Sequence, residues 1–140
     1  MVIVGFTFTK VAAKREKLSG SLSVNNNITL VNVEDAKLAL ADTNQTSLHY
    51  TFKFTSQYNN NTQQEIGLIE LEGYVASMVE KEEAKKILQQ WKKEKKLDNK
   101  LLEVIINYAL ERCNIEAILL SKEVGLPAPL KLPRIASKEE

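Results

Sequence analysis

The sequence has very few residues that could build a reactive or cross-linked site. It contains one cysteine, Cys113, and one histidine, His49, among 140 residues. A single cysteine excludes an intramolecular disulfide framework and suits a reducing, cytoplasmic compartment. One cysteine on a predicted helix and one histidine on a distant predicted strand also lack the spacing of metal ligands. Since no carboxylate, serine and histidine constellation stands out, we predict no metal, no cofactor, no catalytic residues and no enzymatic activity.

An excess of charge of one sign is also missing, as are long hydrophobic runs. Lysine and arginine total 19 against 18 acidic residues, so the net charge of +1 creates no global field for nucleic acid or an anionic membrane. No segment approaches the roughly 20 apolar residues that span a bilayer. The apolar stretch Met1 to Phe6 lacks a basic leader and a cleavage site, so it is interpreted as a strand. We predict a cytoplasmic protein without nucleic-acid binding or membrane insertion.

Three local features are most simply structural. His49 lies among threonine and lysine residues on a polar strand face, which favours an ordinary surface residue. Cys113 belongs to an apolar helical stripe, where a buried thiol stays protonated and inert. Lysines are concentrated around the first predicted helix, but interspersed glutamates and the lack of aromatic residues favour a solvated helix face over a nucleic-acid site. These lysines are Lys85, Lys86, Lys92, Lys93, Lys95, Lys96 and Lys100.

The period of the hydrophobic pattern changes near residue 79, from strand-like alternation to helix-like spacing. Alternation is clearest at residues 48–55, and 66–79 continues it after an asparagine-rich turn that favours a hairpin. Residues 2–11, with Val4, Phe6 and Phe8 on one face, and residues 28–33 complete four predicted strands. The segments between them, 12–24 and 34–46, fit strand extensions, irregular crossovers or short helical turns.

Two helices are predicted in the second half, over about 80–96 and 98–124. Asp98 or Asn99 can cap the second helix, and Gly125 suits its C-terminal end. The expected apolar stripe of the first helix is Ala84, Ile87, Leu88 and Trp91. That of the second is Leu102, Ile106, Ala109, Cys113, Ala117 and Leu120, widened by Leu101, Ile105 and Tyr108. The predicted class is therefore α+β: a four-stranded antiparallel sheet followed by two helices in a single domain, residues 1–140.

The C-terminal segment is rich in proline and leucine. Residues 126–133 read Leu-Pro-Ala-Pro-Leu-Lys-Leu-Pro. Each proline fixes its own φ, removes a backbone donor and favours extended geometry in the residue before it. We expect an extended tail over 126–140 whose leucines pack against the protein's own surface or against a partner.

The order of four strands, a shorter helix, a longer helix and a Pro-Leu tail resembles the SecB-type export chaperones, in a divergent, archaeal-style form. Residues 102–133 carry the most specific part of the resemblance, especially 108–113 (Tyr-Ala-Leu-Glu-Arg-Cys) and the tail at 126–133. Residues 66–73 resemble the last strand of that family more loosely. The bacterial family is acidic and docks a translocation motor on acidic sheet residues, whereas this chain is near neutral. Glu70 and Glu72 are interpreted as a solvated strand edge in preference to a remnant of such a docking site.

The resemblance implies a homotetramer, built as a dimer of dimers, that holds unfolded or partly folded polypeptides in apolar surface grooves without hydrolysing ATP. A protein of this kind needs exposed apolar surface and strand edges that pair with an extended peptide. The candidate polypeptide-binding residues are Phe6, Phe8, Tyr50, Trp91, Leu126, Leu130 and Leu132.

Two other functions remain open from the sequence. A dedicated interaction module would hold one partner, such as an antitoxin-like protein, on the same apolar surface. A small-molecule or acyl-thioester binding enzyme of the hotdog type is disfavoured, because such folds wrap the sheet around an early helix whereas both predicted helices here are C-terminal.

Overall fold

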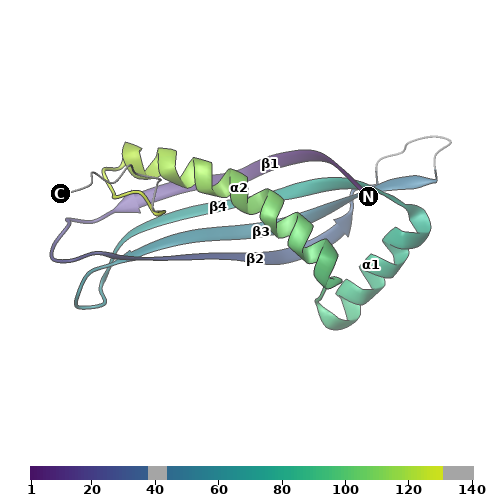
Figure 1. Ribbon diagram of the computed structural model, residues 1–140, viewed down its shortest axis with the longest axis horizontal. Coiled ribbons are helices and arrows are strands. Elements are labelled where there is room, and N and C mark those ends of the chain that lie inside the picture. The colour runs from purple at the N-terminus through teal and green to yellow at the C-terminus, as the bar shows by residue number, and fades with distance from the viewer. Residues whose placement is uncertain (38–43, 131–140) are drawn as a thin grey trace, which may run out of the picture.

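A computed structural model describes residues 1–37 and 44–130, and shows four long strands followed by two helices (Figure 1). The elements are β1 (Val2–Arg15), β2 (Ser23–Asp35), β3 (Gln45–Asn59), β4 (Glu65–Glu80), α1 (Lys81–Glu94) and α2 (Asn99–Glu123). The predicted α+β class, with a four-stranded antiparallel sheet before two helices, is confirmed. The tail beyond residue 130, including the candidate Leu132, lies outside the described residues.

All neighbouring strands of the sheet are antiparallel, in the order β1-β4-β3-β2. The predicted hairpin between β3 and β4 is present. Its loop is held by Asn60, whose Oδ1 accepts hydrogen bonds from the backbone N–H groups of Thr62 and Gln64 at 3.0 and 2.9 Å. The two edges of the sheet are therefore β1 and β2, which are consecutive in sequence but lie on opposite sides.

The strands extend beyond the predicted segments at most of their ends. Residues 12–15, 23–27, 34–35 and 45–47 all pair with neighbouring strands, although their own patterns were too weak for assignment. The polar run Asn25 to Asn27 illustrates the reason, because it pairs with Ser56 and its neighbours on β3 despite the low strand propensity of asparagine. Pairing with an adjacent strand outweighs local propensity in such segments.

The predicted face of Val4 is wrong. The register between β1 and β4 shifts between Ile3 and Gly5, so Val4 is an inserted residue of a β-bulge. As a result Ile3 packs against the core together with Phe6 and Phe8, whereas Val4 is 56% exposed. A bulge changes the two-residue period without leaving a mark in the hydrophobic pattern, so simple alternation predicted the wrong side for this residue.

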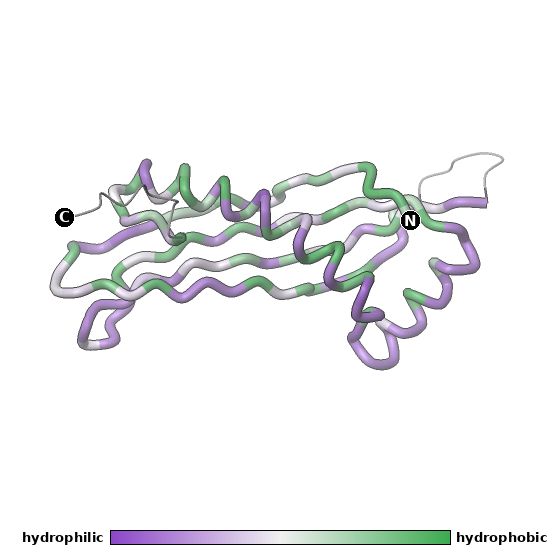
Figure 2. Tube along the Cα trace, viewed as in Figure 1, coloured by the Kyte–Doolittle hydropathy of each residue, from purple (hydrophilic) through white to green (hydrophobic). Residues whose placement is uncertain are grey.

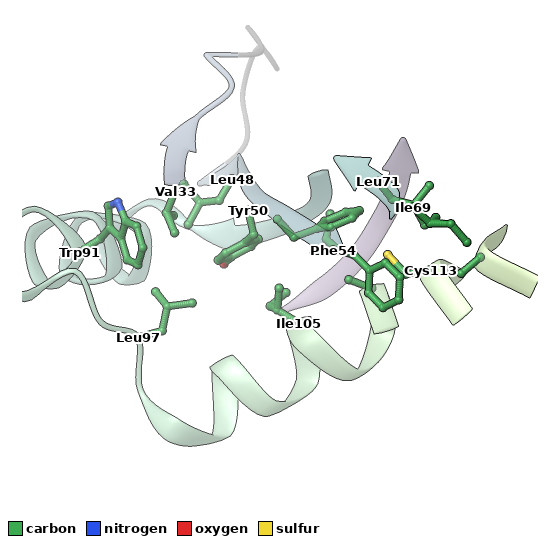
Figure 3. Packing of buried hydrophobic residues seen from close by; sticks show 14 of the residues in the cluster. Val33, Leu48, Tyr50, Phe54, Ile69, Leu71, Trp91, Leu97, Ile105 and Cys113 are labelled. Carbon is green, nitrogen blue, oxygen red and sulfur yellow. The ribbon is translucent and has the colours of Figure 1, made fainter. Parts of the chain in front are cut away.

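Both helices lie on one face of the sheet and bury its apolar side chains. The aromatic and aliphatic residues of β3 and β4, including Tyr50 and Leu71, form the core under α2 (Figure 3). Figure 2 shows hydrophobic and hydrophilic residues alternating along the strands and around α2. The residues of α2 that are buried are Ile105, Ala109, Cys113, Ala117 and Ser121.

The buried stripe of α2 is thus shifted from the predicted one. Leu102, Ile106 and Leu120 are partly exposed, because α2 crosses the sheet diagonally from the β2 side to the β1 side (Figure 1). The diagonal crossing leaves the beginning of α2 beside the β2 edge. On α1 the predicted stripe is confirmed, with Ala84, Ile87 and Trp91 buried and Leu88 partly buried.

Helix α2 ends as the sequence predicted. Gly125 has a φ of 69°, the left-handed conformation that glycine adopts without steric cost. The N–H of Leu126 donates to the carbonyl oxygen of Ser121 at 2.8 Å, and the N–H of Gly125 donates to that of Lys122 at 3.3 Å. This pair of bonds is a Schellman motif, which reverses the chain and sends it back across the sheet.

Candidate functional site: a groove beside the edge strand β2

An open groove of about 740 Å³ lies between the edge strand β2 and the first half of α2. Aliphatic side chains from both walls face it, and the reversal between α1 and α2 closes one end. We call it the β2 groove. Its lining residues are Ile28, Thr29, Leu30, Trp91, Lys95, Lys96, Leu97, Asn99, Leu102, Glu103 and Ile106.

The end of the groove at α1 is built around Trp91. The helix terminates at Lys95, which has a left-handed φ of 54° and donates its N–H to the carbonyl oxygen of Trp91 at 2.9 Å. Lys95 Nζ lies 5.5 Å from the centroid of the Trp91 ring, a cation–π arrangement. Trp91 is 7% exposed, and its Nε1 is buried without a hydrogen-bond partner among the described residues. This end therefore contains a buried polar hydrogen that the described fold does not satisfy.

The β2 wall of the groove is a strand edge. Among the described residues, β2 is hydrogen-bonded within the sheet only to β3, so its other edge presents backbone groups to any chain that lies alongside. From Ser23 to Leu30 the register with β3 is unbroken, and a shift at Val31 interrupts it. An extended polypeptide could therefore pair with the regular part of this edge while its side chains reach the groove.

The C-terminal segment Gly125 to Leu130, which we call the strap, crosses the opposite end of the sheet. It meets the strands in their spatial order: Gly125 at β1, Leu126 at β4, Pro127 at β3 and Pro129 at β2. Leu126 is buried against Gly67 of β4, where an added Cβ would lie 3.0 Å from its side chain. The strap therefore ends beside the edge strand β2, near the groove.

Three side chains of the sheet hold alternate carbonyl groups of the strap. Arg15 Nη1 donates to Gly125 O at 3.2 Å, and Tyr58 Oη donates to Pro127 O at 2.6 Å. Asn26 Nδ2 donates to Pro129 O at 2.9 Å, while the Asn26 Oδ1 accepts a hydrogen bond from Ser56 Oγ. Because proline has no N–H, the strap cannot form a regular strand ladder with the sheet. These side-chain hydrogen bonds to its carbonyl groups take the place of that ladder.

A second, smaller groove lies on the other side of α2, beside β1. It has a volume of about 470 Å³ and is lined by Ile3, Val104, Asn107, Tyr108, Leu110, Glu111 and Asn114. We call it the β1 groove. The Arg112 guanidinium stacks 3.4 Å from the centroid of Tyr108, and the ring of Phe6 lies 6.1 Å from that of Tyr108. Much of the aromatic surface on this side is thus already in contact with other side chains.

The candidate residues from the sequence do not form one cluster. Phe6 and Phe8 are half-buried near the β1 side and pack against Phe52 with centroid separations of 5.4 and 6.3 Å. Tyr50 has no exposed surface and receives a hydrogen bond from Ser77. Only Trp91 lines the β2 groove. The strap residues Leu126 and Leu130 lie at the other end of the sheet, with Leu126 buried and Leu130 half-buried.

Apart from Lys95, Lys96 and Asn99, which were interpreted as a solvated face and a helix cap, the sequence did not single out the other residues of the groove. Leu102 and Ile106 were assigned to the buried stripe of α2, and Ile28 and Leu30 to a short strand. Their shared exposure results from the diagonal position of α2, which one-dimensional periodicity does not contain. Leu97 offered the clearest signal, as a single apolar residue in the lysine-rich connection between the helices.

The titratable residues of interest lie away from the β2 groove. Burial raises the pKa of the Cys113 thiol to about 12, so it remains protonated at neutral pH. His49 stacks on Tyr74 with a centroid distance of 4.1 Å on the face of the sheet opposite the helices. Within residues 1–37 and 44–130, no group of three or more histidine, cysteine or acidic side chains is placed to hold a metal ion.

Glu70 and Glu72 lie on that same open face, but the prediction that they mark a strand edge is wrong. Their strand, β4, is central and pairs with both β1 and β3. Glu70 Oε2 lies 2.7 Å from Lys10 Nζ, and this hydrogen-bonded pairing lowers the pKa of the Glu70 carboxyl and raises that of the Lys10 amine.

None of the described helices is long and apolar enough to cross a bilayer.

Comparisons with known proteins show a likeness in fold. No protein-family model matches the chain, and no curated protein sequence matches it. A solved structure with a similar fold is the Mycobacterium tuberculosis Rv1957 SecB-like chaperone in complex with a ChAD peptide from the Rv1956 HigA1 antitoxin. The two share 14% sequence identity with a TM-score of 0.53, over 98% of this chain and 91% of that chain. The chain therefore has a SecB-like fold.

Proposed function

We propose that this protein binds nonnative polypeptides as extended segments along the β2 groove, without ATP hydrolysis or other chemistry. The observation that carries the proposal is the combination of an aliphatic groove and a strand edge that no described strand pairs with. Leu102 and Ile106 provide apolar surface on one side, and Leu30 belongs to the edge strand on the other. Main-chain pairing gives affinity for any sequence, and apolar contacts favour segments that are normally buried.

The structural neighbour supports this proposal. That protein is a SecB-like chaperone seen with a peptide, which is the kind of ligand an edge-lined groove accommodates. The same neighbour supports a protein without enzymatic activity. Of the seven candidate residues from the sequence, the proposal keeps those that lie near a groove. Trp91 is therefore favoured as a binding residue over Tyr50, whose side chain is fully buried.

Trp91 provides a direct measurement of binding. It is the single tryptophan of the chain and lines the groove, so a bound peptide should change its fluorescence. Suppression of the aggregation of a reduced, unfolded model protein should be measured in parallel, in the absence of ATP. If the groove is the binding site, both signals should saturate at the same ratio of chain to substrate.

A matched pair of variants distinguishes the two grooves. Leu102→Asn places a polar amide in the β2 groove, and Leu110→Asn places the same group in the β1 groove; both leucines are half-buried on α2. We expect the first to weaken peptide binding about tenfold, the loss of roughly 1.4 kcal/mol of apolar contact, and the second to leave it nearly unchanged. Equal losses, or no binding by the unaltered protein, would contradict the proposal.

We also propose that the protein forms a homo-oligomer, as a dimer of dimers, through the outer side of α2. Three aliphatic residues on that side are exposed although no described element covers them: Val104 at 46%, Ile115 at 62% and Leu119 at 54%. Burial between copies would remove this apolar surface from water. Light scattering should give about four chain masses, and Ile115→Asp with Leu119→Asp should give a smaller species with unchanged secondary structure.

A second candidate function is a dedicated interaction module with one partner. The observation that favours it is that the peptide bound to the structural neighbour comes from an antitoxin. Competition would separate the two functions, because unrelated unfolded chains displace a ligand from a general chaperone but not from a dedicated module. Displacement by several unrelated substrates with similar affinities would support the general function.

A further inference from the structure

We propose that the β2 groove selects apolar segments that carry carboxylate side chains next to the apolar core. This inference rests on the proposed function and specifies the ligand of the same groove. The argument comes from the charges on the two walls and at the two ends. It concerns extended peptides whose flanking Asp or Glu residues lie near Lys95 and Lys96 when the core lies on the aliphatic lining.

The two walls of the groove differ in charge. The β2 wall has no charged residue from Ser23 to Val33, so this edge provides pairing and apolar contact without selecting charge. The other wall is the connection between the helices. Residues 92–103 contain five lysines against three carboxylates, and the lining itself contains Lys95 and Lys96 against Glu103. Any selection by charge therefore comes from the helical wall and favours an anionic ligand.

The two lining lysines are available for a ligand. Both are exposed, and neither forms an ion pair with another residue in the described part of the chain. Lys95 Nζ lies over the Trp91 ring, which places a positive charge at the rim of the apolar surface. A carboxylate on the ligand would meet this charge immediately beyond the point where the apolar contacts end. The groove would thus contact the apolar core of the ligand and its acidic flank at adjacent positions.

The beginning of α2 adds to this field. Asp98 occupies the N-cap position but makes no side-chain capping bond, and the first turn contains no acidic residue. The backbone N–H groups of such a turn carry partial positive charge and favour an anion nearby. The end of α1 has the opposite partial charge, but its last turn carries Lys92 and Lys93, which offset it. The end of the groove between the helices is therefore positive overall.

Among the described residues, the part of β2 that meets the strap carries no charge. Asn26 and Pro129 are neutral and are already hydrogen-bonded to each other. An acidic flank would find no positive partner among these groups, whereas an apolar residue would meet Ile28 of the lining. The described lining is thus uncharged along β2 and basic at the end between the helices, and the proposal assigns the carboxylates to the basic end.

Three synthetic peptides test the proposal. They share one core of leucine residues alternating with threonine, and two Asp, two Gln or two Lys residues flank the core at each end. Affinities are measured by Trp91 fluorescence at low and high salt. We expect the Asp peptide to bind about fivefold more tightly than the Gln peptide, and the Lys peptide to bind most weakly, since exposed ion pairs each contribute modestly. At about 1 M salt the differences should largely disappear.

A matched pair of double variants locates the effect. Lys95→Gln with Lys96→Gln should reduce the ratio of the affinities for the Asp and Gln peptides from about fivefold to about one. Lys92→Gln with Lys93→Gln removes the same charge from residues that do not line the groove, and should retain most of the preference. Loss of preference in the second pair alone would overturn the assignment.

The outcomes distinguish this inference from the proposed function. Equal binding of all three peptides, or tighter binding of the Lys peptide, overturns the charge selection and leaves polypeptide binding in the groove intact. Failure of all three peptides to bind, together with no suppression of aggregation, overturns both. Binding in the predicted order with loss of preference in the Lys95 and Lys96 variant supports both.

Discussion

The strap end of the sheet and the Trp91 end of the β2 groove are built in opposite ways. At the strap end, polar groups are matched: Tyr58 and Asn26 donate to strap carbonyls at 2.6 and 2.9 Å. At the other end, Trp91 Nε1 is buried without a partner in the described structure, and Lys95 has no ion-pair partner there. A buried donor without an acceptor costs about 1 to 3 kcal/mol, so the two ends contribute differently to stability.

This difference indicates that the strap end contributes mainly to stability and the Trp91 end mainly to binding. The strap end closes the sheet and stabilises the folded chain through Leu126 and three side-chain hydrogen bonds. At the Trp91 end, the described residues leave apolar surface, a lysine without an ion-pair partner and an unpaired strand edge. Substitutions at the strap should therefore change stability more than binding, and those at the Trp91 end should change binding more than stability.

The largest effect on stability is expected from Leu126→Ala. This side chain is buried against β4, and its truncation leaves a cavity that the extended strap cannot fill. We expect a loss of about 2 to 4 kcal/mol in the free energy of unfolding, measured by urea denaturation. Leu130→Ala is the matched control, because Leu130 is half-buried on the same strap, and it should cost less than half as much. Similar losses would show that the strap is not anchored at Leu126.

A smaller loss is expected from Tyr58→Phe. The substitution removes the donor to Pro127 O and keeps the ring, so the free energy of unfolding should fall by about 1 kcal/mol. Peptide binding in the groove should change by less than twofold, because Tyr58 does not line it. A larger effect on binding than on stability would contradict the division between the two ends.

The contribution of Tyr58 should disappear in alkali. Burial raises its pKa from 10.0 to about 12 in the folded state, so the neutral, donating form is favoured by folding. The corresponding stability is fully present below pH 10 and is lost as the pH rises from 10 towards 12. The difference between wild type and Tyr58→Phe should therefore shrink over this range. Comparing the pair at each pH cancels the titration of Cys113, whose pKa is also raised.

The smallest change in stability is expected from Trp91→Phe. The substitution removes a buried N–H that has no partner among the described residues, which offsets the loss of apolar ring area. The free energy of unfolding should change by no more than about 0.5 kcal/mol. Trp91→Phe and Tyr58→Phe each remove one hydrogen-bond donor, but only the donor of Tyr58 has a partner in the described structure. A loss as large as that of Tyr58→Phe would show that the indole N–H is satisfied in solution. Because the variant has no tryptophan, chemical unfolding is followed by circular dichroism.

The sequence predicted the two helices more accurately than the sheet. The stripe of Ala84, Ile87 and Trp91 and the stop at Gly125 depend on neighbouring residues, so local pattern was sufficient. The bulge at Val4 depends on the register with β4, which involves residues more than 70 positions away. The site was predicted least well, because its walls come from β2, the end of α1 and α2, and their association depends on a packing angle.

The sequence by itself determined the element order, the predominance of strand before helix, the apolar faces of β3 and β4, and the end of α2 at Gly125. These properties follow from side-chain period and from the restricted geometry of proline and glycine. Only the tertiary structure decided that β1 and β2 form opposite edges, that the strap crosses all four strands, and that Trp91 and Leu30 line one groove. Each of these depends on contacts between distant segments, whose free energy is gained only when the whole chain is folded.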